Sequence, residues 1–499
     1  MKRFAVFALL AAALLGAGLA QRPDTLTIAT DADPPTLDPN LGNQGYTFTV
    51  TAQVFDTLLY RDFSDGKLKP RLATAWRQTN PTTWRFDLRR NVRFQDGTPF
   101  NAEAVKYTLD RLLDPDFKAP NRFQLSAIKE VKVVDADTVD IVTNAPFAPL
   151  VPTLTHPLAG IVSPTAAKRF GKDFGRNPVG TGPYKFEAWD TGNTVTLVAN
   201  RDYWQGAPQI ARIVYRIIPE SATQVIELKS GRLDVLSSVP AEAVADLEKS
   251  ANVTVKKLPG ATHVYLGFNT AEGPTKDLRV RQAIAASIDQ DGIINSLLKG
   301  AAEKGVAPIT PRVFGAAKDL KPIGYSVENA RRLLQQAGVP AGTKLTLITP
   351  NTTLFSKLAQ AVQFSGQQAG LNIEVKLLDF AAWVAAVSKP GYGELFIYWW
   401  TPVSRDADTG LYGRFHSSNI PLNNQTGYRN ATVDRLLDEA RASGDPEVRL
   451  ELYQQIQEQI NRDLPVFTLA YPYTIYVTSN RLVGEVQNST LELWKASLK

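Results

Sequence analysis

The sequence contains no cysteine, one methionine and three histidines among its 499 residues. Without cysteine there is no disulfide framework, no cysteine nucleophile and no thiolate-based zinc site. The histidines, His156, His263 and His416, lie too far apart for a short metal-binding motif. We therefore expect no metal site and no cofactor. Met1 is the only sulfur-containing residue, so a chain that loses its N-terminus would contain no sulfur.

Long hydrophobic runs are also missing beyond the N-terminus. The longest uncharged run includes residues 143–167, which hold five prolines that a membrane-spanning helix would not tolerate. The first twenty residues, by contrast, place Lys2 and Arg3 before an apolar run that ends in small residues, the layout of a secretory signal peptide. We expect cleavage after Ala20 and, without a cysteine to carry lipid, a soluble periplasmic protein.

The sequence also has no large excess of positive over negative charge, or of negative over positive. The net charge is +6, and removal of Lys2 and Arg3 with the signal peptide would lower it to +4. This excess is too small to indicate nucleic-acid binding, so we expect no nucleic-acid partner. The remaining chain of roughly 480 residues is long enough for two or three domains.

The motifs of common enzyme classes are absent. There is no G-x-S-x-G nucleophile elbow and no Walker A loop, and the segment GTGPY at 180–184 is typical of a tight turn. Asp406 and Asp408 form a carboxylate pair that could serve an exported hydrolase as acid and base. Acids at this spacing in a loop are more often solvated or capping, so we expect a protein that is not an enzyme.

The apolar pattern predicts a mixed α/β fold. In the first half, Trp84, Phe86 and Leu88 share one face of a strand by period two, and a helix follows with Asn101 as its N-cap. In the second half, helical and strand patterns alternate, which indicates parallel strands joined by crossover helices. The predicted second-half segments are helix 326–338, strand 344–350, helix 355–370, strand 372–378 and strand 394–400.

Two loops in this second half follow the carboxyl ends of predicted strands, where open α/β sheets bind their ligands. One is TPNTTLF at 349–355, and the other lies within YWWTPVSRDADTGLYGRFHSS at 398–418. Trp399 and Trp400 point to opposite faces of their strand. We expect one of them to be in the core and select Trp400 as the one that lines a cleft.

Three ordered segments then carry a family resemblance: 84–113, 178–235 and 277–294. The second begins PVGTGPYKFEAWDTGNTVTLVANRDYW, and together the three resemble the peptide/nickel group, family 5, of extracellular solute-binding proteins. These are the binding components of ABC importers. The resemblance covers essentially the whole chain after the signal peptide.

The resemblance implies a two-lobed periplasmic binding protein (Venus-flytrap) fold with an extra subdomain in lobe one. We expect lobe I at 21–265, its extra subdomain at about 60–175, lobe II at 266–472, and a C-terminal return to lobe I at 473–499. A monomer of this kind would close on its ligand and present it to an ABC permease in the inner membrane.

The resemblance also bears on the ligand. Dipeptide-binding relatives use an aspartate after the last strand and an arginine in the earlier loop. This chain has Val403 or its neighbours at the first aligned position and Thr349 or Pro350 at the second. Both charged clamps are missing. WTPVSRDADTGLYGRFHSSN is instead similar to the glutathione- and short-peptide-binding subgroup, which implies a di-/oligopeptide or glutathione-like ligand.

By residue type, the two aspartates could accept from a ligand ammonium group, two arginines could bind a carboxylate, and neutral groups could complete the site. The expected ligand contacts are Gln44, Tyr46, Asn351, Thr352, Trp400, Thr401, Arg405, Asp406, Asp408 and Arg414. Alternatively, the two aspartates order their own loop and Tyr46 is a packed aromatic. Other open readings are a metal chelate, which could involve His416, an oligosaccharide held by the tryptophans, or the hydrolase above.

Overall fold

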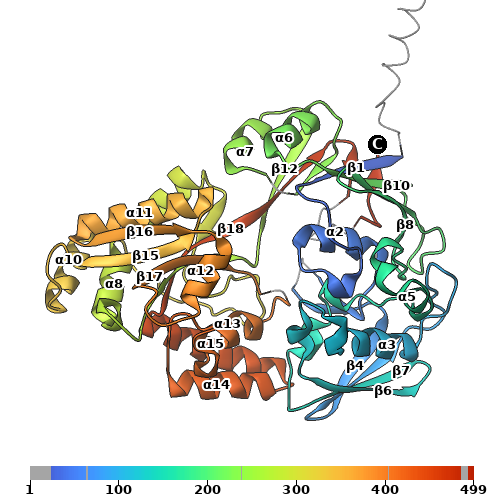
Figure 1. The fold of residues 1–499 in the computed structure, drawn as a ribbon, viewed down its shortest axis with the longest axis horizontal. Coiled ribbons are helices and arrows are strands. Elements are labelled where there is room, and N and C mark those ends of the chain that lie inside the picture. Colours follow the sequence, from blue (N-terminus) through green and yellow to red (C-terminus); the bar gives the residue numbers. More distant parts are fainter. Residues whose placement is uncertain (1–23, 63–65, 238, 403, 485–492) are drawn as a thin grey trace, which may run out of the picture.

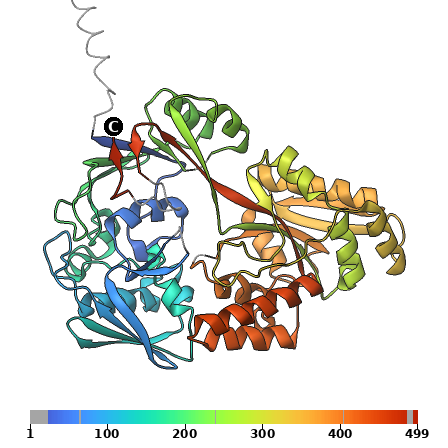
Figure 2. The same cartoon turned by 180° about the vertical axis from the view of Figure 1, so that it is seen from behind.

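The computed structural model describes residues 24–62, 66–237, 239–402, 404–484 and 493–499, so the expected signal peptide and Val403 lie outside the described residues. Two lobes lie side by side, and the long strand β18 (Val466–Ser479) runs from one into the other (Figures 1 and 2). We call the lobe that holds β1 (Thr25–Thr30), β10 (Arg212–Ile217) and the N-terminal helices the first lobe. The lobe that holds β13 (His263–Phe268), β15 (Lys344–Pro350), β16 (Asn372–Leu378) and β17 (Leu395–Trp400) is the second lobe. The two-lobed α/β fold expected from the resemblance is confirmed.

A single mixed sheet is shared by the two lobes through β18. Its path is β16-β15-β17-β13-β18-β11-β1-β10-β9-β8, and β12 and β14 also pair with β18. The other strands are β1 (Thr25–Thr30), β8 (Tyr184–Asp190), β9 (Thr194–Ala199), β10 (Arg212–Ile217), β11 (Val235–Leu236), β12 (Val253–Pro259), β13 (His263–Phe268), β14 (Ala302–Lys304), β15 (Lys344–Pro350), β16 (Asn372–Leu378) and β17 (Leu395–Trp400).

The burial of β18 marks where the chain crosses between the lobes. Val466–Tyr471 is buried against β13, and the segment from Ile475 to Ser479 is buried against β12, whereas Pro472, Tyr473 and Thr474 between them are only half-buried. A strand buried at both ends and less covered in the middle belongs to two cores at once. The exact domain boundaries given above stay a prediction.

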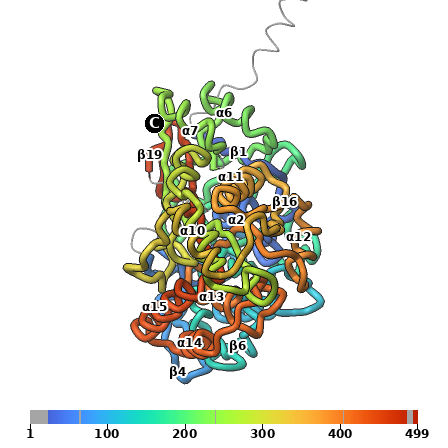
Figure 3. The backbone as a smooth tube through the Cα atoms, turned by 90° about the vertical axis from the view of Figure 1, so that its left-hand side faces the viewer, coloured from blue at the N-terminus to red at the C-terminus, as the bar shows by residue number. Residues whose placement is uncertain are grey.

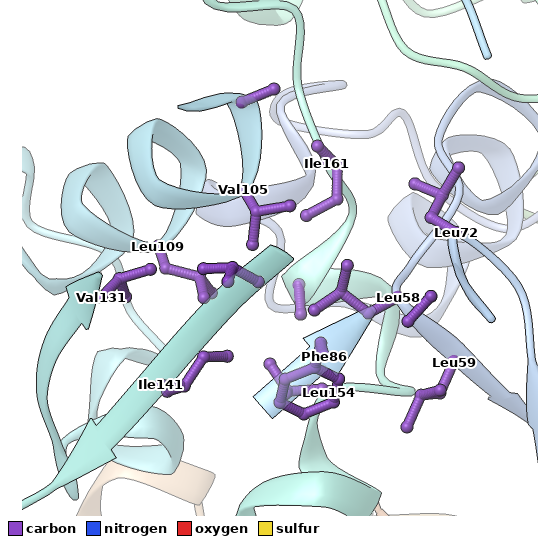
Figure 4. Close-up of a cluster of buried hydrophobic side chains, with 14 of the residues drawn as sticks. Leu58, Leu59, Leu72, Phe86, Val105, Leu109, Val131, Ile141, Leu154 and Ile161 are labelled. Atoms are coloured by element: carbon purple, nitrogen blue, oxygen red, sulfur yellow. The ribbon is translucent and has the colours of Figure 1, made fainter. Parts of the chain in front are cut away.

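The first lobe carries a second, four-stranded sheet packed on helix α3 (Ala102–Leu113). Its order is β4 (Ala73–Asn80), β5 (Thr83–Leu88), β7 (Thr138–Thr143), β6 (Ile128–Asp135). Phe86, Val105, Leu109 and Ile141 meet in its buried core (Figure 4). The predicted strand and helix are confirmed, because residues 84, 86 and 88 are buried and the Asn101 side chain accepts from the N–H of Ala104.

The second lobe shows the predicted alternation. β15, α11 (Thr353–Ala369), β16, α12 (Phe380–Val387) and β17 follow one another, and β15 pairs in parallel with both β16 and β17. Helices α8 (Leu278–Ser287), α10 (Val327–Gln336) and α11 pack in one core of this lobe. Helix α10 begins at Ser326, whose side chain accepts from the N–H of Asn329, as its sequence predicts.

The remaining helices are distributed over both lobes. Figure 3 shows α6 and α7 at one end, and α14 and α15 at the other. Their bounds are α2 (Gly45–Val54), α4 (Leu150–Thr153), α5 (Pro164–Phe170), α6 (Ser221–Lys229), α7 (Ala241–Leu247), α9 (Gln290–Gly292), α13 (Ala407–Phe415), α14 (Ala431–Ala442) and α15 (Pro446–Asp463); short strands are β2 (Leu59–Arg61), β3 (Leu68–Pro70), β19 (Leu482–Val483) and β20 (Ser497–Leu498). Within the described ranges, no helix is both long and apolar enough to span a bilayer.

Candidate ligand-binding site

The two tryptophans that end β17 lie in different surroundings. The Trp399 ring stacks on Phe355 at 4.9 Å between centroids and keeps 38% of its surface exposed. Trp400 is half-buried, its Nε1 donates to the carbonyl of Thr409 at 2.9 Å, and the Arg414 guanidinium lies 4.0 Å over its ring. Trp400, the residue selected from the sequence, is thus held by its own loop, and Trp399 is the more accessible. The sequence alternation separates their faces but does not say which face is covered.

The two aspartates of the DAD motif are buried and paired inside the second lobe. Arg449 in α15 contacts both carboxylate oxygens of Asp406, at 2.6 and 3.0 Å, and Arg441 in α14 contacts both of Asp408, at 2.9 and 2.8 Å. Asp406 also caps α13 by accepting from the N–H of Asp408. The geometry therefore favours the reading in which these aspartates order their own loop. Both carboxylates are thus occupied by arginine partners of the same lobe.

Arg414 and His416 are likewise engaged within the second lobe. Arg414 is buried, donates to the side-chain oxygen of Gln425 at 2.6 Å and stacks on Trp400. The ring of His416 stacks on Tyr412 at 4.5 Å, and its Nδ1 lies 2.7 Å from the Ser418 hydroxyl. These contacts fit a structural role for both side chains. In the part of the chain that the structure describes, no three His, Asp or Glu side chains gather as metal ligands would.

Several predicted contacts are exposed at the edges of the two lobes that border the space between them. Gln44 precedes α2 and is exposed, and Tyr46 in its first turn is half-buried. In the second lobe, Asn351, Thr352 and Thr401 are exposed at the carboxyl ends of β15 and β17. The Thr352 side chain caps α11, and the Thr401 hydroxyl lies 2.8 Å from that of Thr262. Figure 1 shows α2 and α12 on the two sides of that space.

A cavity of about 1100 Å³ lies between the lobes. We call it the interlobe cavity. From the first lobe it is lined by Arg61, Asp62, Gly66, Lys67, Leu68, Trp76, Trp84, Ala148, Val151, Pro152, Lys256, Leu258, Pro259, Thr474 and Tyr476. From the second lobe it is lined by Pro311, Arg312, Val313, Phe314, Arg405, Asp406, Gly444, Pro446, Glu447, Arg449 and Leu450.

Two of the predicted contacts, Arg405 and Asp406, line this cavity. The other eight do not: Gln44, Tyr46, Asn351, Thr352, Trp400, Thr401, Asp408 and Arg414. Most of the lining was missed from the sequence, because it comes from β2, β4, β5, β12, β18 and the segment 311–314. No local pattern marks these segments as neighbours, since only the packing of the two lobes brings them together.

Arg61 and Arg405 place two guanidinium groups close together in the cavity wall. Arg61 Nε donates to the carbonyl of Ser404 at 3.2 Å, next to Arg405 in the chain. Burial lowers the pKa of Arg61. Burial, and then the charge of Arg61, lower the pKa of Arg405 to about 10. Both guanidinium groups remain charged at pH 7, so this wall presents positive charge in a poorly solvated place.

The loop that carries Arg405 is fixed to the neighbouring segment. Phe314 donates its N–H to the carbonyl of Arg405 at 3.0 Å, and Ala407 donates to that of Phe314 at 2.9 Å. Arg405 itself has φ of 51°, in the left-handed region that non-glycine residues seldom adopt. Such a conformation persists only where the surroundings enforce it, and it is often found at binding sites.

The lobes also touch at the far edge of the cavity. The N–H of Ala148 donates to the carbonyl of Arg441 at 2.9 Å, and the Arg441 guanidinium lies 5.3 Å from the Phe147 ring centroid. At Gly444, an added Cβ would lie 2.1 Å from the side-chain oxygen of Gln78. The turn between α14 and α15 therefore closes against the four-stranded sheet of the first lobe.

Two lobes joined by a shared strand, with a cavity walled by both, form the architecture of proteins that bind a solute between their lobes. Residues 67–421 match the model of bacterial extracellular solute-binding proteins, family 5. The chain belongs to this family, as the sequence resemblance predicts.

Individual relatives span the whole fold. The chain is 30% identical to the glutathione-binding protein GsiB of Shigella flexneri serotype 5b (strain 8401), over 97% of this chain and 96% of the relative. Among solved structures, HbpA2 from Haemophilus parasuis is 25% identical with a TM-score of 0.88, covering 95% of this chain and 100% of that chain. DppA from Helicobacter pylori in complex with the peptide STSA is 28% identical with a TM-score of 0.78, covering 95% and 98%.

Proposed function

We propose that this protein captures a short peptide, of the di-/oligopeptide or glutathione class, between its lobes and delivers it to an ABC permease in the inner membrane. The observation that carries the proposal is the interlobe cavity, because residues from both lobes line it. A ligand that contacts both walls binds the closed form better, so it shifts the open–closed population. Support for the ligand class comes from the GsiB relatives and from the peptide-bound DppA structure.

The proposed ligand contacts combine the interlobe cavity with the exposed edges of the lobes. Arg405 supplies charge from the cavity wall, and Gln44, Tyr46, Asn351, Thr352 and Thr401 supply neutral groups. Trp399 joins them in place of Trp400, whose ring is covered by Arg414. Three of the expected contacts are given a positioning role instead: they fix the loop after β17 and do not touch the ligand. They are Asp406, Asp408 and Arg414.

The proposal includes a monomer that works in the periplasm after cleavage behind Ala20, with no lipid anchor, no nucleic-acid partner and no catalysis. The four expected domain segments, 21–265 with its subdomain at about 60–175, 266–472 and 473–499, belong to it. The mass of the protein purified from a secreting host tests the processing. Incubation with glutathione, followed by quantification of the recovered peptide, tests the absence of turnover.

The decisive experiment is native mass spectrometry of gently purified protein, with identification of small molecules released on unfolding. We expect a one-to-one complex whose released ligand fragments as a peptide or glutathione. Added back at about 100 times its dissociation constant, that ligand should stabilise the fold by about 2.7 kcal/mol. A released metal chelate or oligosaccharide, or a protein that no peptide stabilises, would overturn the proposed ligand class.

A further inference from the structure

The described lining of the interlobe cavity has an excess of positive charge. Its basic side chains are Arg61, Lys67, Lys256, Arg312, Arg405 and Arg449, and its acidic side chains are Asp62, Asp406 and Glu447. Asp406 and Arg449 neutralise each other as a buried pair. The remaining basic groups outnumber the remaining acids, so an anion that enters the cavity gains electrostatic attraction at short range.

Contacts with backbone carbonyls place Arg61 beside the loop that carries Arg405. Arg61 donates to two carbonyls, of Ser404 at 3.2 Å and of Gly66 at 2.7 Å, which fixes its side chain between β2 and the loop after β17. Arg405 follows Ser404 directly, so the two guanidinium groups are brought together from different lobes. Burial, and then the charge of Arg61, lower the pKa of Arg405, and a bound carboxylate would offset the repulsion between the two arginines. Arginine forks suit carboxylates because two parallel N–H groups match the two oxygens.

Another part of the cavity wall is apolar and aromatic. Trp76 in β4 and Trp84 in β5 line the cavity together with Val151 and Pro152 from α4. Trp84 is only 8% exposed, and its indole Nε1 has no hydrogen-bond partner among the residues that the structure describes. This wall offers apolar contact area, and it lies in the subdomain that closes against α14 and α15. The cavity lining therefore combines basic side chains with apolar and aromatic ones.

We propose that the interlobe cavity selects a peptide of net negative charge that carries an apolar group, with a carboxylate held between Arg61 and Arg405 and the apolar group against Trp76 and Trp84. This inference rests on the proposed function and narrows its ligand. It favours glutathione-like peptides substituted with an alkyl or aryl group over zwitterionic dipeptides. The volume of about 1100 Å³ exceeds that of most sites for small ligands, so it leaves room for such a substituent.

Isothermal titration calorimetry of the full-length secreted protein first tests which ligand features raise the affinity. The probes are glutathione, its diamide, S-hexylglutathione and a neutral tripeptide. We expect the diamide to bind about tenfold or more weakly than glutathione, because it loses both carboxylates. We expect S-hexylglutathione to bind more tightly than glutathione, because its alkyl chain buries apolar surface.

Variants then assign the effect to residues. Arg61→Gln and Arg405→Gln should each weaken glutathione by about 10- to 100-fold and remove its advantage over the diamide. Trp76→Ala should remove the advantage of S-hexylglutathione and spare glutathione. Arg435→Gln is the matched control, because Arg435 is an exposed arginine paired within α14. Thermal melts identify any variant that fails to fold. The comparison of the four ligands on the unchanged protein still tests the inference in that case, because it needs no variant.

The outcomes separate the two proposals. Equal affinity for glutathione, its diamide and the neutral tripeptide would overturn the charge inference and leave peptide capture standing. Tighter binding of glutathione that Arg61→Gln and Arg405→Gln do not change would overturn the assignment to this cavity. If none of the four probes binds, the inference is overturned, and the native mass spectra decide separately whether the protein captures another short peptide.

Discussion

Arg449 holds both carboxylate oxygens of Asp406 across 43 positions of sequence, at 2.6 and 3.0 Å, and both side chains are buried. The same guanidinium also donates to the hydroxyl of Tyr453 and the carbonyl of Ala440. Burial of two charges is favourable only when each is fully paired and hydrogen-bonded. The pair therefore fixes the loop after β17, and with it Arg405, to helix α15.

The first prediction follows from this pairing. Asp406→Asn leaves the buried Arg449 without its counter-charge, so we expect a loss of about 3 to 5 kcal/mol in the free energy of unfolding, measured by urea denaturation. Asp438→Asn, at an exposed carboxylate of α14, should change stability little. If Asp406→Asn kept its full stability but lost ligand, Asp406 would be a ligand contact after all.

A second prediction concerns the contact between Gly444 and Gln78. A bulky side chain at 444 would meet Gln78 of the first lobe, so Gly444→Trp should hold the lobes apart. Because ligand binds the closed form, its affinity should fall by about tenfold or more, although 444 contacts the far edge of the cavity only. Small-angle scattering should show a larger radius of gyration.

The control for this wedge is Gly324→Trp, because an added Cβ there meets nothing within 4 Å. It should leave affinity and radius unchanged. A Gly444→Trp protein with the radius and affinity of the unchanged chain would mean that Gln78 moves aside and the contact does not limit closure.

Local signals predicted individual elements well. Asn101 and Ser326 each begin a helix as capping residues, and the period-two pattern of Trp84 and Phe86 forms a buried strand. These features depend on neighbours in sequence, which a single chain displays. A helix-capping residue is harder to recognise inside a loop that is expected to bind ligand. Asp406 caps α13, although the sequence around it predicts a ligand-binding loop.

The site itself was less predictable, because it depends on contacts between distant segments. Arg61 donates to the carbonyl of Ser404, which lies 343 positions away in the sequence. Arg449 forms an ion pair with Asp406 and neutralises its charge. The sequence predicts Asp406 and Asp408 as ligand contacts because both are charged and lie in a loop. Only the arrangement of α14 and α15 shows that both already have arginine partners.

A third prediction uses His263, which is 3% exposed in β13 and whose Nδ1 has no hydrogen-bond partner among the described residues. Burial, and then the charge of Arg414, lower the pKa of His263 to about 3. The unfolded chain takes up this proton below about pH 6.5, and the folded protein does not until about pH 3. Stability should therefore fall as the pH decreases between these values, by at most ~1.4 kcal/mol per pH unit from this residue.

His263→Phe removes the proton uptake and keeps a ring beside Tyr265. Urea unfolding of both proteins at pH 7, 6, 5 and 4 measures the difference. We expect the variant to lose less stability than the unchanged protein below pH 6.5 and to show no difference in slope above it. Parallel profiles throughout would show that His263 titrates normally in the folded state.

The last prediction separates the two tryptophans of β17. Trp399→Phe should cost little stability, because Trp399 is 38% exposed and a phenylalanine can still stack on Phe355. Trp400→Phe should cost about 1 to 2 kcal/mol, because it removes the hydrogen bond from Nε1 to Thr409 and weakens the contact with Arg414. The proposed ligand should change the fluorescence of the Trp400→Phe protein as it does that of the unchanged chain, and this change should be reduced in Trp399→Phe. If Trp400→Phe alone abolished it at unchanged affinity, Trp400 would be the ligand-facing residue, as its position in the sequence first indicates.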